Sequence, residues 1–521
     1  MTRRADPPRP DEVETLEPLA PRSAERAPAE PWLTILAHPD PGRIGQRARL
    51  SGERQPLSRQ APEFEREDGS PAGPLQSPFL SRKPAWLSRA PRGGLLLVPD
   101  LEGTALELEG ARVLAPRRLA AADLARGVVL ELGGQVALLL HSRAAPTWSG
   151  EGRGLVGASQ ALDELRQAIE RLAAQPAPVL LRGESGAGKE LVARALHAAS
   201  PRAGAPMVCI NLAAIPATTA ASALFGHMAG AFTGARGDHR GYFEQAEGGS
   251  LLLDEIGTIT PELQATLLRV LESGEIQPVG DGLPRRVDVR VMAATDEDLE
   301  AAMAEGRFRA PLYHRLSACS LRVPALRERR DDIPRLLVHL LRLELAAAGR
   351  PERLDPAGPG QAPWLPAGLV AELTRRPWPG NVRQLHNLAR HLVTTFATAE
   401  QVDAAAALQA LDEPVPPPGQ RAAAPPAPAA RAGELEPQAA LEALRAHGFK
   451  VKAAAAALGI SRTTLYALME QIPGLRKARD LGREELERGL AECGGDLEAL
   501  AARLEVSPHG LKLRLKELGL R

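Results

Sequence analysis

The chain has 521 residues, of which 44% are apolar, and this length and composition predict three or four folded domains. The 64 basic and 64 acidic side chains balance, which does not exclude DNA binding, because a small basic module can be offset elsewhere. No run approaches the roughly eighteen apolar residues of a membrane span, and no apolar segment follows the basic N-terminus, so we expect a cytoplasmic protein without membrane contact. The three cysteines are too far apart for a disulfide framework or a metal cluster.

The N-terminal part of the chain predicts a tail followed by a β domain. Residues 1–30 are rich in Pro, Arg and Glu, a composition typical of disorder. Between residues 31 and 143, short apolar runs separated by Gly and Pro predict strands. The clearest runs are LTIL, GLLLV, TALEL, VVLEL and QVALLLH. Residues 144–153 form a polar linker.

The central segment, residues 154–411, predicts an α/β domain with a parallel sheet. Its strand-like runs alternate with helical periods, as in βαβ units. The runs are PVLLRG, MVCINL, SLLLDE and VRVMAAT. Residues 412–433 are a Pro/Ala linker, which predicts an extended, semi-rigid connection.

The C-terminal region is helical, rich in Ala and Leu, and contains an internal repeat. A shift of 46 residues aligns Leu458, Ile460, Ser461 and Leu465 with Leu504, Val506, Ser507 and Leu511. The repeat divides this region into residues 434–479 and 480–521.

A nucleotide site is predicted where the strand PVLLR is followed by a Gly-rich loop and then a helix, the context that a P-loop requires. Backbone N–H groups of such a loop and the helix N-terminus bind phosphate oxygens, and Lys189 would reach the β- and γ-phosphates of ATP. Glu190 stands where the general pattern has a Ser or Thr that binds Mg²⁺. The loop comprises Gly183, Glu184, Ser185, Gly186, Ala187, Gly188, Lys189 and Glu190.

A second motif, SLLLDE, places two carboxylates at the end of an apolar strand. Asp254 is predicted to hold Mg²⁺ through water, and Glu255 to polarise the water that attacks the γ-phosphate. Phosphoryl transfer also needs a positively charged side chain beside that phosphate, and a neighbouring subunit often supplies it. The candidates by spacing are Arg309, Arg315 and Arg383.

Between these motifs lies GAFTGA, within LFGHMAGAFTGA. Because of this motif and six others in the expected order, residues 155–400 resemble the sigma-54 RNA polymerase activators, a branch of the AAA+ ATPases. The other motifs are GESGAGKE, GYFEQAEGGSLLLDEIG, VRVMAAT, FRAPLYHRL, LRERRDDI and WPGNVRQL. The resemblance implies a ring, commonly a hexamer, in which ATP turnover converts a closed promoter complex of sigma-54 RNA polymerase into an open one. Glu190 fits this branch.

The resemblance also implies roles for individual residues. Asn211 resembles the asparagine that restrains the catalytic glutamate. Arg309 and Arg315 resemble arginine fingers that reach a neighbouring subunit, and Arg383 resembles a sensor on the helical lid. The loop that would touch the sigma factor, chiefly through Phe232 and Thr233, comprises Gly230, Ala231, Phe232, Thr233, Gly234 and Ala235.

Three positions depart from this family's pattern. Asp296 stands where Asn is common and adds a carboxylate near the γ-phosphate. Pro311 removes an N–H beside Arg309 and is expected to shift that side chain. Met228 replaces a common acidic residue beside GAFTGA. Asp296 and Pro311 favour an alternative in which the module binds ATP for assembly but turns over weakly.

Residues 451–470 predict a helix, a turn and a second helix, and resemble the Fis-type helix-turn-helix, which implies binding to double-stranded DNA. The second helix would begin at Ser461, a natural N-cap. The predicted DNA-binding residues are Ser461, Arg462, Thr463, Thr464 and Tyr466. The second repeat carries basic residues on its own second helix. It predicts either a second DNA-reading helix or a dimerisation hairpin.

The β domain resembles a forkhead-associated domain, a β-sandwich that binds phosphothreonine, in RIGQ, LSRKPAWL, PDLEGTALELEGARV and ADLARGVVLELGG. Ser81 and Arg82 of the phosphate-binding set are present. Three other positions are replaced, because Gln46, Pro84 and Glu102 stand where Arg, His and Asn are expected. Arg43 and Arg47 are available to substitute. We therefore expect a sandwich that binds an unidentified protein partner, or the ATPase itself, without phosphate specificity.

Overall fold

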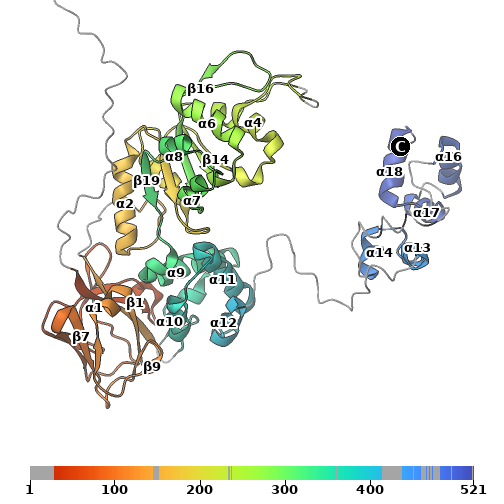
Figure 1. Ribbon diagram of the computed structural model, residues 1–521. Helices are drawn as coiled ribbons and strands as arrows, with labels where there is room; N and C mark the ends of the chain where they lie inside the picture. Colours follow the sequence, from red (N-terminus) through yellow and green to blue (C-terminus); the bar gives the residue numbers. More distant parts are fainter. Residues whose placement is uncertain are drawn as a thin grey trace, which may run out of the picture. The chain divides into compact units, whose positions relative to one another are not determined.

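A computed structural model of the chain describes residues 29–144, 152–232, 235, 237–358, 361–412, 437–449, 451–458, 465, 469, 472, 481–493, 496–518 and 520. The chain forms two compact units, Met1–Glu413 and Pro414–Arg521 (Figure 1). The predicted disordered tail and most of the Pro/Ala linker lie outside the described residues. Within the described residues, no helix is both long and apolar enough to cross a bilayer.

The N-terminal β domain consists of two antiparallel sheets with a short helix, α1 (Ala121–Arg126). The larger sheet has the order β5 (Pro71–Gly73), β4 (Phe64–Glu65), β2 (Arg47–Arg49), β1 (Glu30–Ala37), β12 (Val136–Arg143), β11 (Val128–Leu132), β8 (Leu106–Leu108) and β9 (Ala111–Arg112). The smaller sheet has the order β10 (Arg117–Leu119), β7 (Gly94–Val98), β6 (Ala85–Ala90) and β3 (Arg54–Leu57). All five strand-like runs of the sequence form strands.

The middle strands of the larger sheet are buried on both faces. In β12, Leu138 and Leu140 pack into the core between the two sheets, whereas Ala137 and Leu139 pack into a second core shared with helices of the central segment. In β11, Val129 belongs to this second core. Because successive side chains of a strand point to opposite faces, the apolar residues of VVLEL and QVALLLH contribute to two cores.

The core of the central segment is a five-stranded parallel sheet, as the alternating pattern predicts. Its order is β14 (Met207–Asn211), β15 (Ser250–Asp254), β18 (Arg290–Thr295), β13 (Val179–Arg182) and β19 (Cys319–Arg322). One face packs on α2 (Gln160–Ala173) and α3 (Lys189–Ala198). The other face packs on α4 (Ala217–Phe225), α5 (Tyr242–Gln245), α6 (Pro261–Ser273), α7 (Leu299–Ala304) and α8 (Ala310–Leu316). A small hairpin, β16 (Glu275–Ile276) and β17 (Arg285–Arg286), lies between β15 and β18 in the chain.

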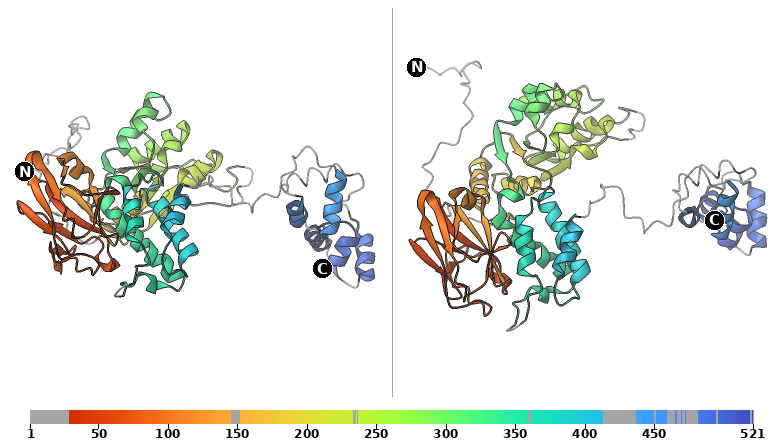
Figure 2. Two further views of the ribbon diagram at one scale, coloured as in Figure 1. Left: turned by 90° about the horizontal axis from the view of Figure 1, so that it is seen from below. Right: turned by 60° about the horizontal axis from the view of Figure 1, so that its bottom comes forward.

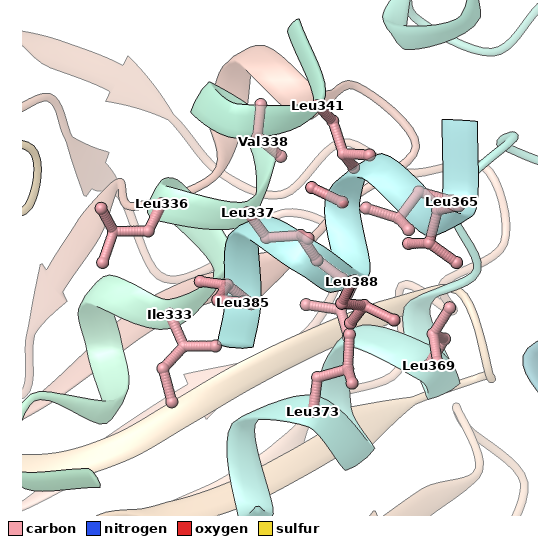
Figure 3. Packing of buried hydrophobic residues seen from close by; sticks show 14 of the residues in the cluster. Ile333, Leu336, Leu337, Val338, Leu341, Leu365, Leu369, Leu373, Leu385 and Leu388 are labelled. Atoms are coloured by element: carbon pink, nitrogen blue, oxygen red, sulfur yellow. The ribbon is translucent and has the colours of Figure 1, made fainter. Parts of the chain in front are cut away.

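A helical lid follows the sheet. It consists of α9 (Ile333–Ala347), α10 (Ala367–Arg375), α11 (Asn381–Phe396) and α12 (Ala404–Asp412). Figure 3 shows Leu337 and Leu341 of α9 pointing toward Leu385 and Leu388 of α11, with Leu373 of α10 beneath them. This is the second core that the β domain shares, and Figures 1 and 2 show the β domain beside α9 and α10.

The buried carboxylate of Asp332 joins the lid to the parallel-sheet core. It is 0% exposed and immediately precedes α9. Its oxygens accept hydrogen bonds from the backbone N–H groups of Ala158 (2.6 Å) and Ser159 (2.9 Å) and from the Ser159 hydroxyl (2.6 Å). Ser159 is the N-cap of α2, and its oxygen also accepts a bond from Leu162 N–H. A Cβ at Gly157 would lie 2.5 Å from the Asp332 carboxyl carbon, so only glycine permits this approach.

The β domain contacts this junction on both sides, at the start of α2 and at the lid. Arg47 and Arg143 each donate to the carbonyl of Ala158, at 2.7 Å and 3.0 Å. On the lid side, Arg330 donates to Gly127 O at 2.8 Å. The guanidinium of Arg375, at the end of α10, forms ion pairs with Glu131 and Glu109 of the β domain. The β domain therefore contacts both the parallel-sheet core and the lid.

The second unit contains two sets of helices. The first set includes α13 (Pro437–Ala446) and α14 (Val451–Ala457). The second includes α16 (Arg483–Glu492), α17 (Leu497–Arg503) and α18 (Pro508–Glu517). Each set has its own small apolar core.

Replacing Asp332 is expected to destabilise the first unit strongly. Asp332→Ala removes the acceptor of three buried hydrogen bonds and the counter-charge of buried Arg329, a loss of roughly 3–5 kcal/mol in the free energy of unfolding. The measurement is the thermal midpoint followed by tryptophan fluorescence, since Trp364 and Trp378 are buried in the shared core. The control is Asp331→Ala at the half-buried neighbour, expected within about 0.5 kcal/mol of the wild type. Equal midpoints for the two variants would contradict this role of Asp332.

Candidate nucleotide-binding site

The Gly-rich loop lies between β13 and α3, as predicted. Gly186 and Gly188 have positive φ angles of 74° and 106°, which turn successive N–H groups toward one side of the loop. Lys189 is the first residue of α3 and is buried. Its ammonium donates to Gly183 O at 2.9 Å, so the charge lies inside the loop. This is the arrangement of a phosphate-binding P-loop.

The two acids of SLLLDE lie at the C-terminal end of β15. Strand β18 separates β15 from β13, so the residues after β18 lie between the P-loop and these acids. Glu255 has φ 58° and ψ 46°, in the left-handed region, which is costly for a residue other than glycine and is typical of functional sites. Asp254 Oδ1 accepts a bond from the Glu255 N–H at 3.1 Å.

The partner of the Glu255 carboxyl in this structure is Asp296. Burial raises the pKa of Glu255, and the negative charge of Asp296 and a hydrogen bond to it raise that pKa further. Asn211 lies beside Asp254 in the sheet register and accepts a bond from Ala213 N–H at 2.9 Å. Restraint of Glu255 by Asn211 therefore stays a prediction, and the effect of Asp296 on the pKa of Glu255 was not foreseen from the sequence.

The lid closes over the P-loop through α11. Arg383 donates to the Ser185 hydroxyl at 2.9 Å, which places the predicted sensor arginine on the loop. The Nδ2 of Asn381 donates to Glu184 at 3.0 Å and to Ser185 O at 3.1 Å. Asn381 is fully buried and has φ +50°. Its role was missed from sequence, although it lies in the motif WPGNVRQL.

Glu184 connects the P-loop to the start of the lid. It forms an ion pair with Arg327, and the hydrogen bonds from Arg327 and Asn381 lower the pKa of Glu184 to about 2. The backbone of Val382 donates to Gly186 O at 3.0 Å. A Cβ at Gly186 would lie 2.5 Å from Gly380 O, so loop and lid touch through their backbones. A lid movement would therefore change the shape of the P-loop.

The two predicted arginine fingers are exposed on and beside α8. Arg309 is the N-cap of α8, and its N–H donates to the Gln264 side chain at 2.8 Å. Arg315 donates to the carbonyl of Leu271 at 3.0 Å and 2.8 Å. Pro311 lies in the first turn of α8, where a missing N–H breaks no helical hydrogen bond. Pro311 therefore gives no reason for a displaced Arg309.

The described ends of the GAFTGA loop form a closed turn. Gly230 N–H donates to Ala235 O at 2.9 Å, and Ala235 N–H donates to Phe232 O at 3.0 Å. Phe232 is 44% exposed and its ring contacts that of His227. Thr233 and Gly234 lie outside the described residues. Met228, one of the departures, accepts a weak bond from Arg285 through its sulfur at 3.4 Å.

The carboxylate arrangement fits Mg²⁺ bound with a nucleotide. Among the described residues, no cluster of three or more His, Cys, Asp or Glu forms a protein-only metal site. Mg²⁺ in phosphoryl-transfer sites takes one or two carboxylates and completes its coordination with phosphates and water. Asp254 supplies one such carboxylate, whereas Glu190 is paired with Arg194 on the surface of α3.

A parallel sheet with a P-loop, an acidic strand end beside it, and a helical lid whose arginine reaches the loop defines a AAA+ P-loop ATPase. Residues 155–322 match the Sigma-54 interaction domain family, residues 327–417 the AAA+ ATPase lid domain family, and residues 433–471 the family described as bacterial regulatory protein, Fis family. The matches fall in the same order as the described core, lid and first helical set.

Curated relatives agree with these matches. The chain is 39% identical over 410 residues to the anaerobic nitric oxide reductase transcription regulator NorR of Aeromonas salmonicida (strain A449), covering 77% of this chain and 70% of that protein. It is 47% identical over 248 residues to the DNA-binding transcriptional regulator NtrC of Escherichia coli (strain K12), covering 48% of this chain and 50% of that protein. The crystal structure of NtrX from Brucella abortus in complex with ADP aligns with a TM-score of 0.44 at 32% identity, covering 62% of this chain and 69% of that chain.

The chain belongs to the sigma-54-dependent transcriptional activators. It is an ATPase that activates transcription in an ATP-dependent manner and binds DNA through a Fis-type helix-turn-helix. The predicted DNA-reading residues, Ser461, Arg462, Thr463, Thr464 and Tyr466, lie outside the described residues. Leu465, between them, is buried in the core of the first helical set.

Two substitutions should separate nucleotide binding from hydrolysis. Lys189→Ala removes the charge inside the loop and should abolish ATP binding. Glu255→Ala removes the predicted base and should retain binding while lowering phosphate release by about 10²–10⁴-fold. The measurements are ATP binding by titration and phosphate release in steady state. Glu272→Ala, at an exposed glutamate of α6, is the control and should behave as the wild type. Normal turnover in Glu255→Ala would contradict the assignment of the base.

Proposed function

We propose that this activator works as a ring, most simply a hexamer, that uses ATP hydrolysis to open promoter complexes of sigma-54 RNA polymerase. The observation that carries the proposal is the pairing, within one domain, of a P-loop site with a closed turn that exposes Phe232. A large exposed aromatic side chain on a turn suits contact with another protein. Hydrolysis at the sheet edge would then change how this turn is presented to the sigma factor.

In the proposed hydrolysis step, each group has a separate task. The P-loop N–H groups and Lys189 bind the phosphates. Glu255, in its ionised form, would accept a proton from the attacking water. Asp254, through water, would hold Mg²⁺, which supplies charge neutralisation at the β- and γ-phosphates when bound. Arg309 and Arg315 are exposed, as arginines that reach a neighbouring subunit's site must be.

A specific observation favours the second candidate, an ATP-bound assembly with weak turnover. Burial and the negative charge of Asp296 beside Glu255 raise the pKa of the Glu255 carboxyl, and a second carboxylate at this place would repel the γ-phosphate. The two candidates share the site and differ in rate. A phosphate-release rate that rises on addition of sigma-54 holoenzyme and promoter DNA supports the first. A rate that stays near zero supports the second.

We propose that the DNA sites lie upstream of the promoters and that the protein works in the cytoplasm, where bacterial DNA and RNA polymerase are found. Ring formation brings the Fis-type modules of several subunits together. Several weakly binding modules on one assembly gain affinity through effective concentration.

We propose that the β domain is a forkhead-associated-like sandwich that has lost phosphate recognition and binds the ATPase instead. Arg43 donates hydrogen bonds to the carbonyls of Gly73, Pro74 and Leu75. Arg47 donates a hydrogen bond to the carbonyl of Ala158. Neither arginine is therefore available to replace the missing phosphate ligands. At the two loops where the resemblance expects the phosphate, Lys83 forms an ion pair with Glu102.

Substitution in the GAFTGA turn should uncouple ATP turnover from promoter opening. Thr233→Ala leaves the phosphate motifs unchanged, so ATPase activity should be retained. Open-complex formation at a sigma-54 promoter, measured by permanganate reactivity of melted thymines, should be lost. Thr394→Ala, at an exposed threonine of the lid helix α11, should leave both activities intact. If Thr233→Ala still opens the promoter, the turn is not the coupling element.

The β domain should not bind phosphothreonine tightly. Each lost charge-assisted hydrogen bond weakens binding by roughly 1.5–3 kcal/mol. Two or three such losses convert a micromolar site into one of about millimolar affinity or weaker. The test is titration of the full chain with a phosphothreonine peptide library and with its unphosphorylated twin. Micromolar binding that requires the phosphate would contradict the proposal and indicate an upstream kinase.

A further inference from the structure

The second set of C-terminal helices repeats the first, helix by helix. Helices α13 and α16 begin at 437 and 483 and end at 446 and 492, a difference of 46 at both ends. Helices α14 and α17 begin at 451 and 497 and end at 457 and 503, again a difference of 46. For these described helices, the sequence repeat is therefore a structural repeat with the same helix lengths.

The buried positions repeat with the same spacing. Four residues of the first set that are at most 2% exposed correspond to residues of the second set that are at most 1% exposed. The pairs are Ala440 with Leu486, Ala454 with Leu500, Ala455 with Ala501, and Leu465 with Leu511. The described helices of the two sets therefore bury equivalent positions, as two copies of one fold do. The Fis family match covers only the first set, at residues 433–471.

The third helix of the second set, α18, begins and packs as a recognition helix does. Ser507 is its N-cap and accepts a bond from Gly510 N–H at 3.1 Å. Leu511 and Leu515 are at most 1% exposed and anchor one side of α18 in the local core. Lys512 and Lys516, four residues apart, are both exposed and lie on one face of the helix.

Charge is separated between the helices of the second set. The sequence of α18, PHGLKLRLKE, has three basic residues and one acidic residue. The sequence of α16, REELERGLAE, has four acidic residues and two basic ones. A polyanion is therefore attracted to α18 and repelled by α16, which orients the module on a duplex. A symmetric contact between the α18 faces of two chains would bring like charges together, which opposes dimerisation through this face.

We propose that residues 480–521 are a second DNA-binding helix-turn-helix, in which α18 enters the major groove of double-stranded DNA and Lys512 and Lys516 contact its phosphates. The inference rests on the DNA-binding function of the first set. The ion pair between Arg445 and Glu505, at 2.8 Å, joins α13 to the turn before α18.

The test is the salt dependence of DNA binding by the full chain. Lys512→Gln/Lys516→Gln keeps most of each exposed side chain and removes two positive charges. Each lost phosphate contact lowers the magnitude of the slope of log K against log salt by about 0.9, so the slope should fall by about 2. Binding is measured by fluorescence anisotropy with a random-sequence duplex of about 30 base pairs, long enough for recognition helices one or two helical turns apart.

The matched control is Arg483→Gln/Arg488→Gln, which removes two exposed positive charges from α16 of the same set. Its slope should equal that of the wild type. Helical circular dichroism and oligomer mass are recorded for all three proteins. An unchanged slope in the lysine variant overturns the proposal, and an altered mass with that unchanged slope identifies a dimerisation hairpin. If the wild type itself fails to bind the duplex, both the DNA-binding function of the first set and this proposal are contradicted.

Discussion

The buried carboxylate of Asp332 is the constraint on which the arrangement of the first unit depends. It receives hydrogen bonds from the start of α2, at Ala158 and Ser159, and it precedes the first lid helix. A buried carboxylate without these donors would cost several kcal/mol, so this junction between core and lid forms in one geometry. The β domain reinforces it, because Arg47 and Arg143 donate to the same Ala158 whose N–H binds Asp332.

The geometry of the nucleotide site depends on this junction. Residues next to Asp332 reach the P-loop, since Arg329 donates to Ala187 O at 3.2 Å and Arg327 pairs with Glu184. On the other side of the loop, Asn381 and Arg383 bind it from α11. The β domain contacts α10 of the same lid through Glu131 and Arg375. A signal that changes the β domain thus has a continuous packed route to the phosphate-binding loop.

Much of this architecture was predictable because local patterns carry it. The Gly-rich loop after an apolar strand, the acids after SLLLDE and the alternating apolar runs each follow from short-range chemistry. The short strands β2, β3, β4 and β9 were not predicted, because two to four residues give no clear periodicity. Asp296 as the partner of Glu255 and Asn381 as a ligand of the P-loop were missed as well. Both contacts join segments far apart in the chain, and no local pattern encodes them. The double burial of β11 and β12 appears in the sequence only as nearly continuous apolar runs, which do not identify the second packing partner.

The central claim is that ATP hydrolysis, and not ATP binding alone, drives promoter opening. The most direct measurement is open-complex formation by sigma-54 holoenzyme on a promoter with an upstream binding site, in the presence of the full-length wild-type protein. The reaction is compared with ATP, with a non-hydrolysable ATP analogue and without nucleotide. We predict melted thymines with ATP only. Equal melting with the analogue, or none with ATP while phosphate is released, would contradict the account.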